Sequence, residues 1–189
     1  RFCCILSSSI RPYHSRKHKH FIDGTIVAMP DIIVIAHNIR STHNVGSIFR
    51  TSEGFGVSKI ILSGYTPYPV LPGDTRLPHI AEKLTAQIHK PALGAESMVP
   101  FEYQPVPDFA ALKTAGYRIV GLEQDARSIM LDDYTTPDKI VLLLGEEVNG
   151  ITSDMRAQCD DLIEIPMVGQ KESFNVSVAA GIALYRLTT

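Results

Sequence analysis

The amino-acid sequence predicts an α/β fold with a mostly parallel sheet and helices on both faces. Two observations support this prediction. Short apolar segments alternate along the chain with segments of helical periodicity. The apolar segments are continuous, as is typical of parallel strands that are buried on both faces. The chain has 189 residues, of which 44% are hydrophobic, so it is long enough for one domain with its own core.

The first predicted elements form a strand–helix–strand unit. Residues 32–36 read IIVIA, a short run rich in β-branched residues that predicts a buried strand. Residues 44–55 place apolar side chains at helical spacing, and Gly56 is expected to end this helix. Residues 59–64 (KIILSG) are the second predicted strand. A proline-rich loop follows, and a helix is expected within 79–90.

The second half of the chain continues the alternation. The segment MVPFEYQ (98–104) is expected to be an edge strand, and residues 108–116 are expected to form a helix that ends at Gly116. Two apolar strands are predicted at 117–124 and 139–145. The last predicted elements are a short helix over 153–159 with Ser153 as its N-cap, a strand over 161–169 and a helix over 175–187.

The composition narrows the possible functions. The formal net charge of −2 neither indicates nor excludes nucleic-acid binding, because a local basic patch is enough for it. The odd set of three cysteines favours a reduced, cytoplasmic protein over a disulfide scaffold, and Cys159 is more typical of a core residue than of a nucleophile. No apolar run approaches the ~20 residues of a membrane span, and no Cys/His cluster has zinc spacing. We therefore expect neither a membrane nor a metal.

Residues 1–29 are expected to be a basic extension of a domain formed by residues 30–189. The segment RPYHSRKHKH (11–20) has the composition of an RNA-binding arm or a metal site. A solvated, flexible tail is the simpler interpretation, because nothing in the segment would order it. Cations in such a tail would add salt-dependent affinity for RNA.

Small and polar residues collect where the predicted strands end, which is where ligands bind in open α/β sheets. Glycine follows three of these strands, at Gly64, Gly145 and Gly169, and allows a ligand to approach the backbone closely. Ordinary turn glycines are the alternative at each position. Neither a G-x-G-x-x-G sequence nor a P-loop is present, so a dinucleotide site of the usual kind is not expected.

The stretch HNVGSIFRTSEGFG (43–56) contains more than a plain strand-to-helix turn needs. Asn44 is the predicted N-cap, and Gly46 would leave the first helical turn open to a packing partner. Arg50 lies two turns into the helix, and helical side chains lean toward the N-terminus, so it is expected to reach back toward the sheet. These groups together predict an anion site, and a surface ion pair between Arg50 and Glu53 is the alternative.

Three stretches in order resemble the SpoU/TrmH family of RNA ribose 2′-O-methyltransferases, in the SPOUT superfamily. The first places Asn44, Gly46 and Arg50 in the arrangement N-x-G-x-x-x-R. The second, LLLGEEVNGI, matches L-G-x-E-x-x-G. The third, IPMVGQKESFNVSVAAGIALY, matches I-P-M followed by S-x-N-V-S. The resemblance covers about residues 31–187, which is nearly the whole chain apart from the basic extension.

The resemblance implies methyl transfer from S-adenosylmethionine (S-adenosyl-L-methionine) to a ribose 2′-hydroxyl of RNA, with tRNA more expected than rRNA. It also implies a deep trefoil knot near the C-terminus and a homodimer in which Arg50 points toward the interface. General rules of chain topology alone would predict an unknotted chain. Two positions depart from the family pattern: Glu146 stands where Asn is common, and Phe174 stands where Leu is common.

The resemblance also implies roles for individual residues. Arg50 would hold the phosphate beside the target ribose and stabilise the developing alkoxide, since a guanidinium that stays protonated is a poor base. Asn44 would orient Arg50 or the ribose, and Glu147 would hold Asn44 and the loops of the knot. Ser173 and Asn175 would order the cofactor loop, or merely cap the last helix. The expected cofactor-binding residues are Leu122, Leu144, Gly145, Gly150, Ile165, Met167 and Phe174.

Two other functions are compatible with the fold class. One is a SPOUT-like RNA-binding or assembly factor without catalytic activity, but the complete motif set argues against it. The other is a generic nucleotide-binding α/β enzyme, but the absence of phosphate-binding glycine loops argues against that.

Overall fold

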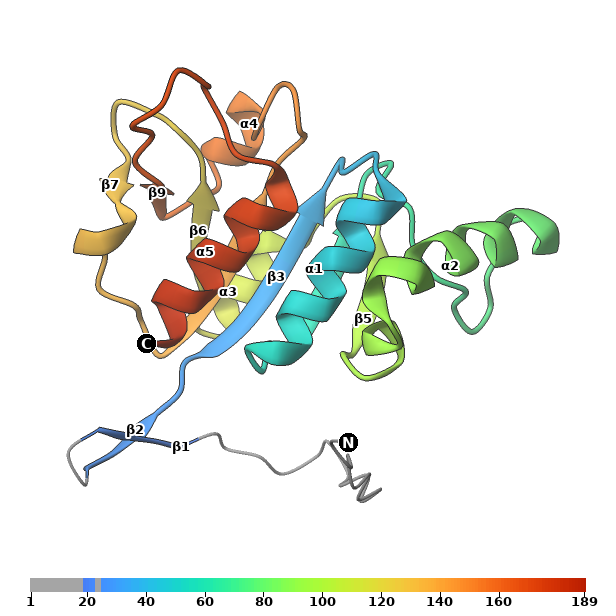
Figure 1. Ribbon diagram of the computed structural model, residues 1–189, viewed down its shortest axis with the longest axis horizontal. Helices are drawn as coiled ribbons and strands as arrows, with labels where there is room; N and C mark the ends of the chain where they lie inside the picture. The colour runs from blue at the N-terminus through green and yellow to red at the C-terminus, as the bar shows by residue number, and fades with distance from the viewer. Residues whose placement is uncertain (1–18, 23–24) are drawn as a thin grey trace, which may run out of the picture.

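The computed structural model describes residues 19–22 and 25–189. Its main sheet consists of β3 (Asp31–His37), β4 (Lys59–Ser63), β5 (Phe101–Gln104), β6 (Arg118–Leu122), β7 (Ile129–Met130), β8 (Lys139–Leu144) and β9 (Asp161–Glu164). These strands lie in the order β5-β4-β3-β8-β6-β9-β7, and every neighbouring pair is parallel (Figure 1). The α/β class is confirmed, and the seven-stranded sheet is parallel throughout.

Helices cover both faces of this sheet. They are α1 (Thr42–Gly54), α2 (Pro78–Ala92), α3 (Phe109–Thr114), α4 (Ser153–Arg156) and α5 (Val176–Thr188), with short 3-10 turns η2 (Ala95–Ser97) and η3 (Leu131–Asp133). Helices α1 and α5 lie side by side on one face, α3 and α4 lie on the other, and α2 projects from the side (Figure 1). A separate antiparallel hairpin joins β1 (Lys19–Ile22) to β2 (Thr25–Ala28).

The packing explains why the strands read as continuous apolar runs. In β3, Ile32 and Val34 belong to the core cluster under α1 and α5, whereas Ile33 and Ile35 belong to the cluster under α3 and α4. Successive side chains of a strand point to opposite faces, so a sheet covered on both faces leaves no solvent-facing position for a polar residue. All four of these side chains are almost completely buried.

The elements match most of the predicted segments, including the edge strand at β5 and the helix at α2. Two predicted N-caps are wrong. Helix α1 begins earlier than expected, so Ser41 is its N-cap and accepts a hydrogen bond from the Asn44 backbone, while Asn44 lies in the first turn. Helix α4 has Thr152 in the cap position, with no side-chain bond, and Ser153 is its first residue.

Three more outcomes concern the ends and edges of the fold. Strand β9 is shorter than predicted and ends before Pro166, which has no N–H group for a sheet hydrogen bond. The two-residue strand β7 was not predicted, because so short a segment carries no periodicity. Residues 1–18 of the predicted basic tail lie outside the described residues. Within the described ranges, no helix is both long and apolar enough to span a bilayer.

The order of the strands reverses between β3 and β8. From β3 the chain moves outward to β4 and β5, whereas β8, β6 and β9 lie on the opposite side. In open α/β sheets such a reversal marks the place where ligands bind, because the loops that follow the two strands diverge there. Here the two loops diverge toward a hollow on either side, and Glu147 in the loop after β8 also bonds to the backbone of Arg40 and Ser41 in the loop after β3.

Candidate active site

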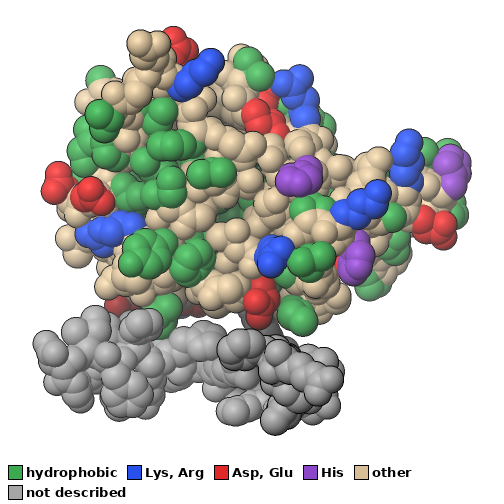
Figure 2. Space-filling model, viewed as in Figure 1, with side chains coloured by type: hydrophobic (Ala, Val, Ile, Leu, Met, Phe, Trp, Pro, Cys, Tyr) green, Lys and Arg blue, Asp and Glu red, His purple; other side chains and the backbone are tan. Residues whose placement is uncertain are grey.

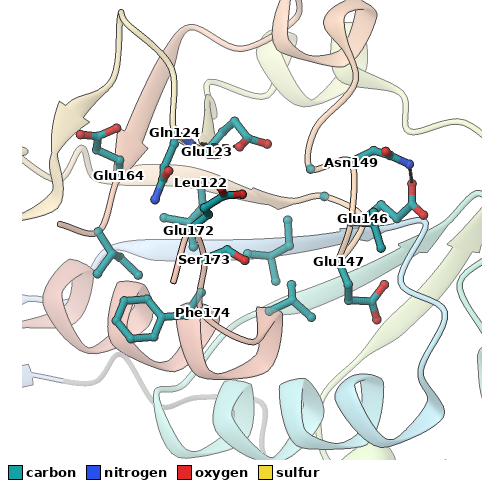
Figure 3. Close-up of a pocket in the computed structure, with 17 residues that line it drawn as sticks. Leu122, Glu123, Gln124, Glu146, Glu147, Asn149, Glu164, Glu172, Ser173 and Phe174 are labelled. Carbon is teal, nitrogen blue, oxygen red and sulfur yellow. Dashed lines mark hydrogen bonds between the residues drawn. The ribbon is translucent and has the colours of Figure 1, made fainter. Parts of the chain in front are cut away.

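A cavity of about 240 Å³ lies at the carboxyl ends of β6, β8 and β9, beside the start of α5 (Figure 3). We call it the donor cavity, after the methyl donor that the sequence resemblance implies. Six of the seven residues expected to bind the cofactor line it, and Met167 does not. Met167 is half-buried and lies beyond Pro166, where the chain has left the sheet. The six lining residues from the sequence prediction are Leu122, Leu144, Gly145, Gly150, Ile165 and Phe174.

The loop after β8 explains why two of these residues are glycines. Glu146 and Gly150 exchange two backbone hydrogen bonds of 3.0 and 2.9 Å, so the loop closes on itself. A Cβ atom on Gly145 would lie 2.4 Å from the carbonyl carbon of Gly150. Gly150 itself has a φ of +65°, and a Cβ there would lie 2.1 Å from the Glu123 carboxylate. Only glycine fits at either position without moving the loop.

Carboxylates surround the donor cavity, and sequence reasoning missed most of them. Glu123 accepts a 2.6 Å hydrogen bond from the backbone of Ile151, which ties the loop after β6 to the loop after β8. Glu164 and Glu172 also line the cavity and make no hydrogen bond or ion pair with any part of the chain that the structure describes. The signal was available, because Glu123 and Glu164 stand at or directly after strand ends. This lining favours a ligand with positive charge.

A chain of hydrogen bonds connects the three sequence motifs beside the cavity. The Asn44 amide donates to Glu147 Oε1 at 3.1 Å, and the Asn175 amide donates to Asn44 Oδ1 at 3.1 Å. The backbone N–H groups of Arg40 and Ser41 also donate to the Glu147 carboxylate, at 3.3 and 3.4 Å. Asn44 is buried, so these contacts fix α1, the loop after β8 and the start of α5 relative to one another.

The carboxyl of Glu147 is held in its charged form by these contacts. Partial burial raises its pKa, but the hydrogen bonds from its own backbone, from Asn44 and from the backbone of Arg40 and Ser41 outweigh that effect. The net result is a pKa below the usual value of a glutamate. Glu147 is therefore the negative end of a fixed network at the start of α1.

The predicted anion site at the start of α1 is wrong as a ligand site, because the chain fills it. Ser41 Oγ accepts from the Asn44 backbone, and Glu147 takes the N–H groups that precede the helix. Helix α2 covers the predicted open turn: a Cβ on Gly46 would lie 2.3 Å from the carbonyl oxygen of Ile88. Gly46 thus allows two helices to pack closely and leaves no room for a ligand.

Three further predicted residues occupy different positions. Arg50 is exposed on α1, lines neither hollow, and makes no hydrogen bond or ion pair within the described ranges, so neither the contact with Asn44 nor the pair with Glu53 is formed. Ser173 lines the donor cavity. Asn175 caps α5, because its side-chain oxygen accepts a hydrogen bond from the Ser177 backbone at 2.9 Å. Its amide also donates to Asn44, so one side chain both caps the helix and takes part in the network.

A model of the SpoU rRNA Methylase family matches residues 73–185. The chain is also 36% identical over 160 residues to 23S rRNA (guanosine-2′-O-)-methyltransferase RlmB of Nitrosomonas europaea, a match that covers 82% of this chain and 55% of the relative. The chain belongs to the SpoU rRNA methylase family. The family resemblance that the three motifs indicated is therefore confirmed. The chain spans only about half the length of this relative and of a second one, an uncharacterized tRNA/rRNA methyltransferase of Mycolicibacterium paratuberculosis.

Solved structures of the SpoU family share the fold. The A. aeolicus TrmH/SpoU tRNA modifying enzyme superposes with a TM-score of 0.69 at 26% identity, over 84% of this chain and 74% of that one. An AdoMet-bound rRNA methyltransferase from Sinorhizobium meliloti also superposes with a TM-score of 0.69, at 24% identity, over 84% of this chain and 56% of the other. In this SpoU-family chain, most residues that line the donor cavity belong to the second and third motifs of the sequence, and Leu122, Glu123, Gln124 and Glu164 complete the lining.

Proposed function

We propose that this chain transfers a methyl group from S-adenosylmethionine to a ribose 2′-hydroxyl of RNA. The observation that carries the proposal is the donor cavity, which the second and third motifs build in a member of the SpoU family. The Nitrosomonas relative is named for 23S rRNA and the A. aeolicus structure for tRNA. The higher identity belongs to the rRNA enzyme, so we place rRNA before tRNA, in reverse of the sequence-based order.

The donor cavity fits S-adenosylmethionine in shape and charge. Leu122, Leu144, Ile165 and Phe174 offer an apolar surface for the adenine ring, and Gly145 and Gly150 of the loop after β8 lie on the cavity lining beside them. The carboxylates of the lining suit a ligand that carries an ammonium and a sulfonium. When bound, S-adenosylmethionine supplies a methyl group that its positive sulfur has already activated, and no metal is required for that activation.

The protein must supply the alignment of the ribose and the stabilisation of its developing negative charge. Glu147, Asn44 and Asn175 fix the loop after β8 against α1 and the start of α5, so they act as positioning residues for the cavity wall. Ser173 lies on the cavity lining, where its hydroxyl can contact the substrate. Arg50 is the cation that would bind the RNA phosphate and the alkoxide, as the resemblance implies.

The exposed position of Arg50 supports a homodimer. Arg50 lines neither hollow of its own chain, and α5 beside it exposes Val178 and Tyr185, which are 50% and 60% exposed. Figure 2 shows apolar side chains gathered on the face that carries α1 and α5. Contiguous apolar surface of this kind is typical of an interface. We propose that a second copy docks on this face and that each Arg50 serves the partner's donor cavity.

The remaining expectations from the resemblance are part of the same proposal. The trefoil knot would involve the loops that line the donor cavity, and family membership supports it. Residues 1–29 would be an extension of the domain formed by residues 30–189. A cytoplasmic location agrees with Cys159 as a free thiol; burial raises its pKa to about 11, so it is an inert core group.

Calorimetric titration of the purified chain with S-adenosylmethionine tests the proposal first. We expect saturable binding in the micromolar range, followed by the appearance of 2′-O-methylribose in rRNA or tRNA incubated with the chain and the cofactor. A folded chain that binds no S-adenosylmethionine would contradict the proposal and favour a SPOUT-like RNA-binding factor without catalytic activity.

A further inference from the structure

A second hollow lies at the same edge of the sheet, over β3, β4 and β5. It is an open groove of about 650 Å³ that runs between the loop after β4 and helix α2. We call it the tyrosine groove, because three tyrosines line it. The lining residues are Arg40, Ser41, Thr42, Gly64, Tyr65, Thr66, Pro67, Tyr68, Arg76, Leu84, Gln87 and Tyr103.

Aromatic and guanidinium groups form a fixed floor in the tyrosine groove. The rings of Tyr68 and Tyr103 stack with centroids 4.2 Å apart and planes inclined by 21°. The Arg76 guanidinium lies 3.5 Å from the Tyr68 centroid and is held by the carboxylate of Asp74 and the carbonyl of Tyr68. The Tyr103 hydroxyl donates to the carbonyl of Gly64 at 2.6 Å. The polar groups of the floor thus have their hydrogen-bond partners within the protein, so the floor is a rigid support.

Two groups of the groove remain available to a ligand. Tyr65 is 52% exposed, and its position is fixed by the hydrogen bond of its backbone N–H to Asn38 Oδ1 at 3.2 Å. The Arg40 side chain is 60% exposed and forms an ion pair with Glu146 at 3.5 Å. A flat aromatic face and a guanidinium are the groups with which proteins hold the bases and phosphates of single-stranded RNA.

The tyrosine groove and the donor cavity share one wall. Arg40 and Ser41 line the groove, and they contact Glu146 and Glu147, which line the cavity. Tyr65 lines the groove together with Arg40 and Ser41 and so lies on the same side of it as the shared wall. A strand of RNA whose target ribose enters the donor cavity therefore has a neighbouring nucleotide within reach of the groove.

The charges also distinguish the two hollows. Helix α2 forms the outer side of the groove through Leu84 and Gln87, and it exposes Lys83 and Lys90, with Glu82 as its only carboxylate. Figure 2 shows Lys, Arg and His side chains on this projecting lobe. The donor cavity is instead lined by carboxylates, which repel a phosphate backbone. RNA is thus favoured on the α2 side of the wall.

We propose that the tyrosine groove binds a single-stranded nucleotide next to the methylated one, with its base stacked on Tyr65 and its phosphate held by Arg40. The inference rests on the proposed function, because it takes the bound RNA to be the methyl acceptor. In this proposal the loop after β4 determines which base is accepted next to the methylated nucleotide. The residues that bind the methyl donor are a separate set.

Binding of fluorescein-labelled RNA to the full chain tests the groove. The probes are an oligoadenylate 12-mer and the same 12-mer with abasic ribose at its central positions, measured by fluorescence anisotropy. We expect Tyr65→Ala to weaken binding of the base-bearing probe about tenfold and to leave the abasic probe unchanged. Tyr65→Phe is the matched control and should bind like the wild type, because it keeps the ring. Arg40→Gln should weaken both probes and flatten the salt dependence.

Cross-linking and cofactor binding separate the possible failures. A 12-mer with 4-thiouridine should cross-link within residues 65–68. Three results would each overturn the proposal that the groove binds a nucleotide. They are equal RNA affinity of Tyr65→Ala and wild type, cross-links confined to other segments, and no saturable RNA binding. Calorimetry with S-adenosylmethionine is run on the same samples. Cofactor binding with an unaffected Tyr65→Ala would reject RNA binding by the groove alone. A Tyr65 effect without cofactor binding would reject the proposed function and leave the groove as an RNA site that is not next to a methylated nucleotide.

Discussion

The two hollows at the carboxyl edge of the sheet are lined by different kinds of residues. The donor cavity lies over β6, β8 and β9 and combines glycine backbone, aliphatic side chains and carboxylates. The tyrosine groove lies over β3, β4 and β5 and combines aromatic rings with guanidinium groups. One wall, made by the loops after β3 and β8, separates them. Two ligands of opposite charge can thus meet at one sheet edge without competing for one set of side chains.

Arg50 lines neither hollow, yet it is the residue whose replacement should have the largest effect on the reaction. We expect Arg50→Ala to lower the rate of methyl transfer at least about 100-fold, since a group that stabilises developing charge is lost. S-adenosylmethionine binding should be unchanged by calorimetry. A variant that methylates RNA at the normal rate would show that Arg50 has no catalytic role.

Mixing two impaired variants, at an S-adenosylmethionine concentration too low to load the Gly145→Ala variant, decides which copy Arg50 serves. If Arg50 serves the partner's cavity, Arg50→Ala mixed with Gly145→Ala should regain about a quarter of wild-type activity, because half of the dimers then hold one complete site. If Arg50 serves its own cavity, the mixture should stay inactive.

Gly145→Ala is expected to damage the donor cavity and spare the groove. Its Cβ would lie 2.4 Å from the backbone of Gly150, so the loop after β8 must shift. We expect S-adenosylmethionine affinity to fall about tenfold or more, because the loop that lines the cavity is displaced, and RNA binding to change little. Gly169→Ala is the matched control, because its Cβ would meet nothing within 4 Å. Equal cofactor affinity in both variants would mean that the loop adapts.

Gly46→Ala is expected to damage the tyrosine groove and spare the donor cavity. Its Cβ would lie 2.3 Å from the backbone of Ile88 in α2, so this helix must move, and α2 forms one side of the groove. We expect a loss of about 2 kcal/mol in the free energy of unfolding, together with weaker RNA binding and nearly unchanged cofactor affinity. Gly54→Ala, whose Cβ would meet nothing within 4 Å, is the control. The measurements are urea denaturation and the two binding titrations.

Glu147→Gln tests the wall itself and should have the smallest effect. In the folded state the pKa of Glu147 lies below its ordinary value of 4.5. The ionised carboxylate therefore stabilises the fold above pH 4.5, and this stabilisation is lost as the pH falls through the folded-state pKa. We expect a loss of about 1 kcal/mol at neutral pH, because the carboxylate is partly exposed. Denaturation of both proteins should show that the difference shrinks below about pH 4.5. A difference that is constant with pH would contradict the role of the charge.

The sequence was sufficient for the class of the fold and for placing six of the seven expected cofactor-binding residues on the lining of the donor cavity. Continuous apolar runs predicted the parallel strands, and the motifs placed Gly145, Gly150 and Phe174 at strand ends. The cap of α1 was missed because Asn38, Ser41, Thr42 and Asn44 are all good capping residues, and only the backbone path selects Ser41.

The tyrosine groove could not be predicted because its contacts are distant in the sequence. Tyr68 lies in a proline-rich connection after β4, and its stacking partner Tyr103 lies on the next strand, β5, beyond the whole of helix α2. The position of Arg50 was also beyond reach, because helical periodicity does not say which side of α1 the neighbouring helices leave open. Packing against α2 and α5 determines that side.

The place of β8 in the sheet has a consequence for synthesis of the chain on the ribosome. Strand β3 pairs with β4 soon after both have emerged, but its other edge pairs with Val141 and its neighbours, about a hundred residues later. The bond from Asn175 to Asn44 spans 131 positions and can form only after Asn175 has been made. Until β8 inserts, the nascent sheet has an open apolar edge, which is the feature that chaperones recognise and that promotes aggregation. The donor cavity is therefore completed only after the last helix has been made.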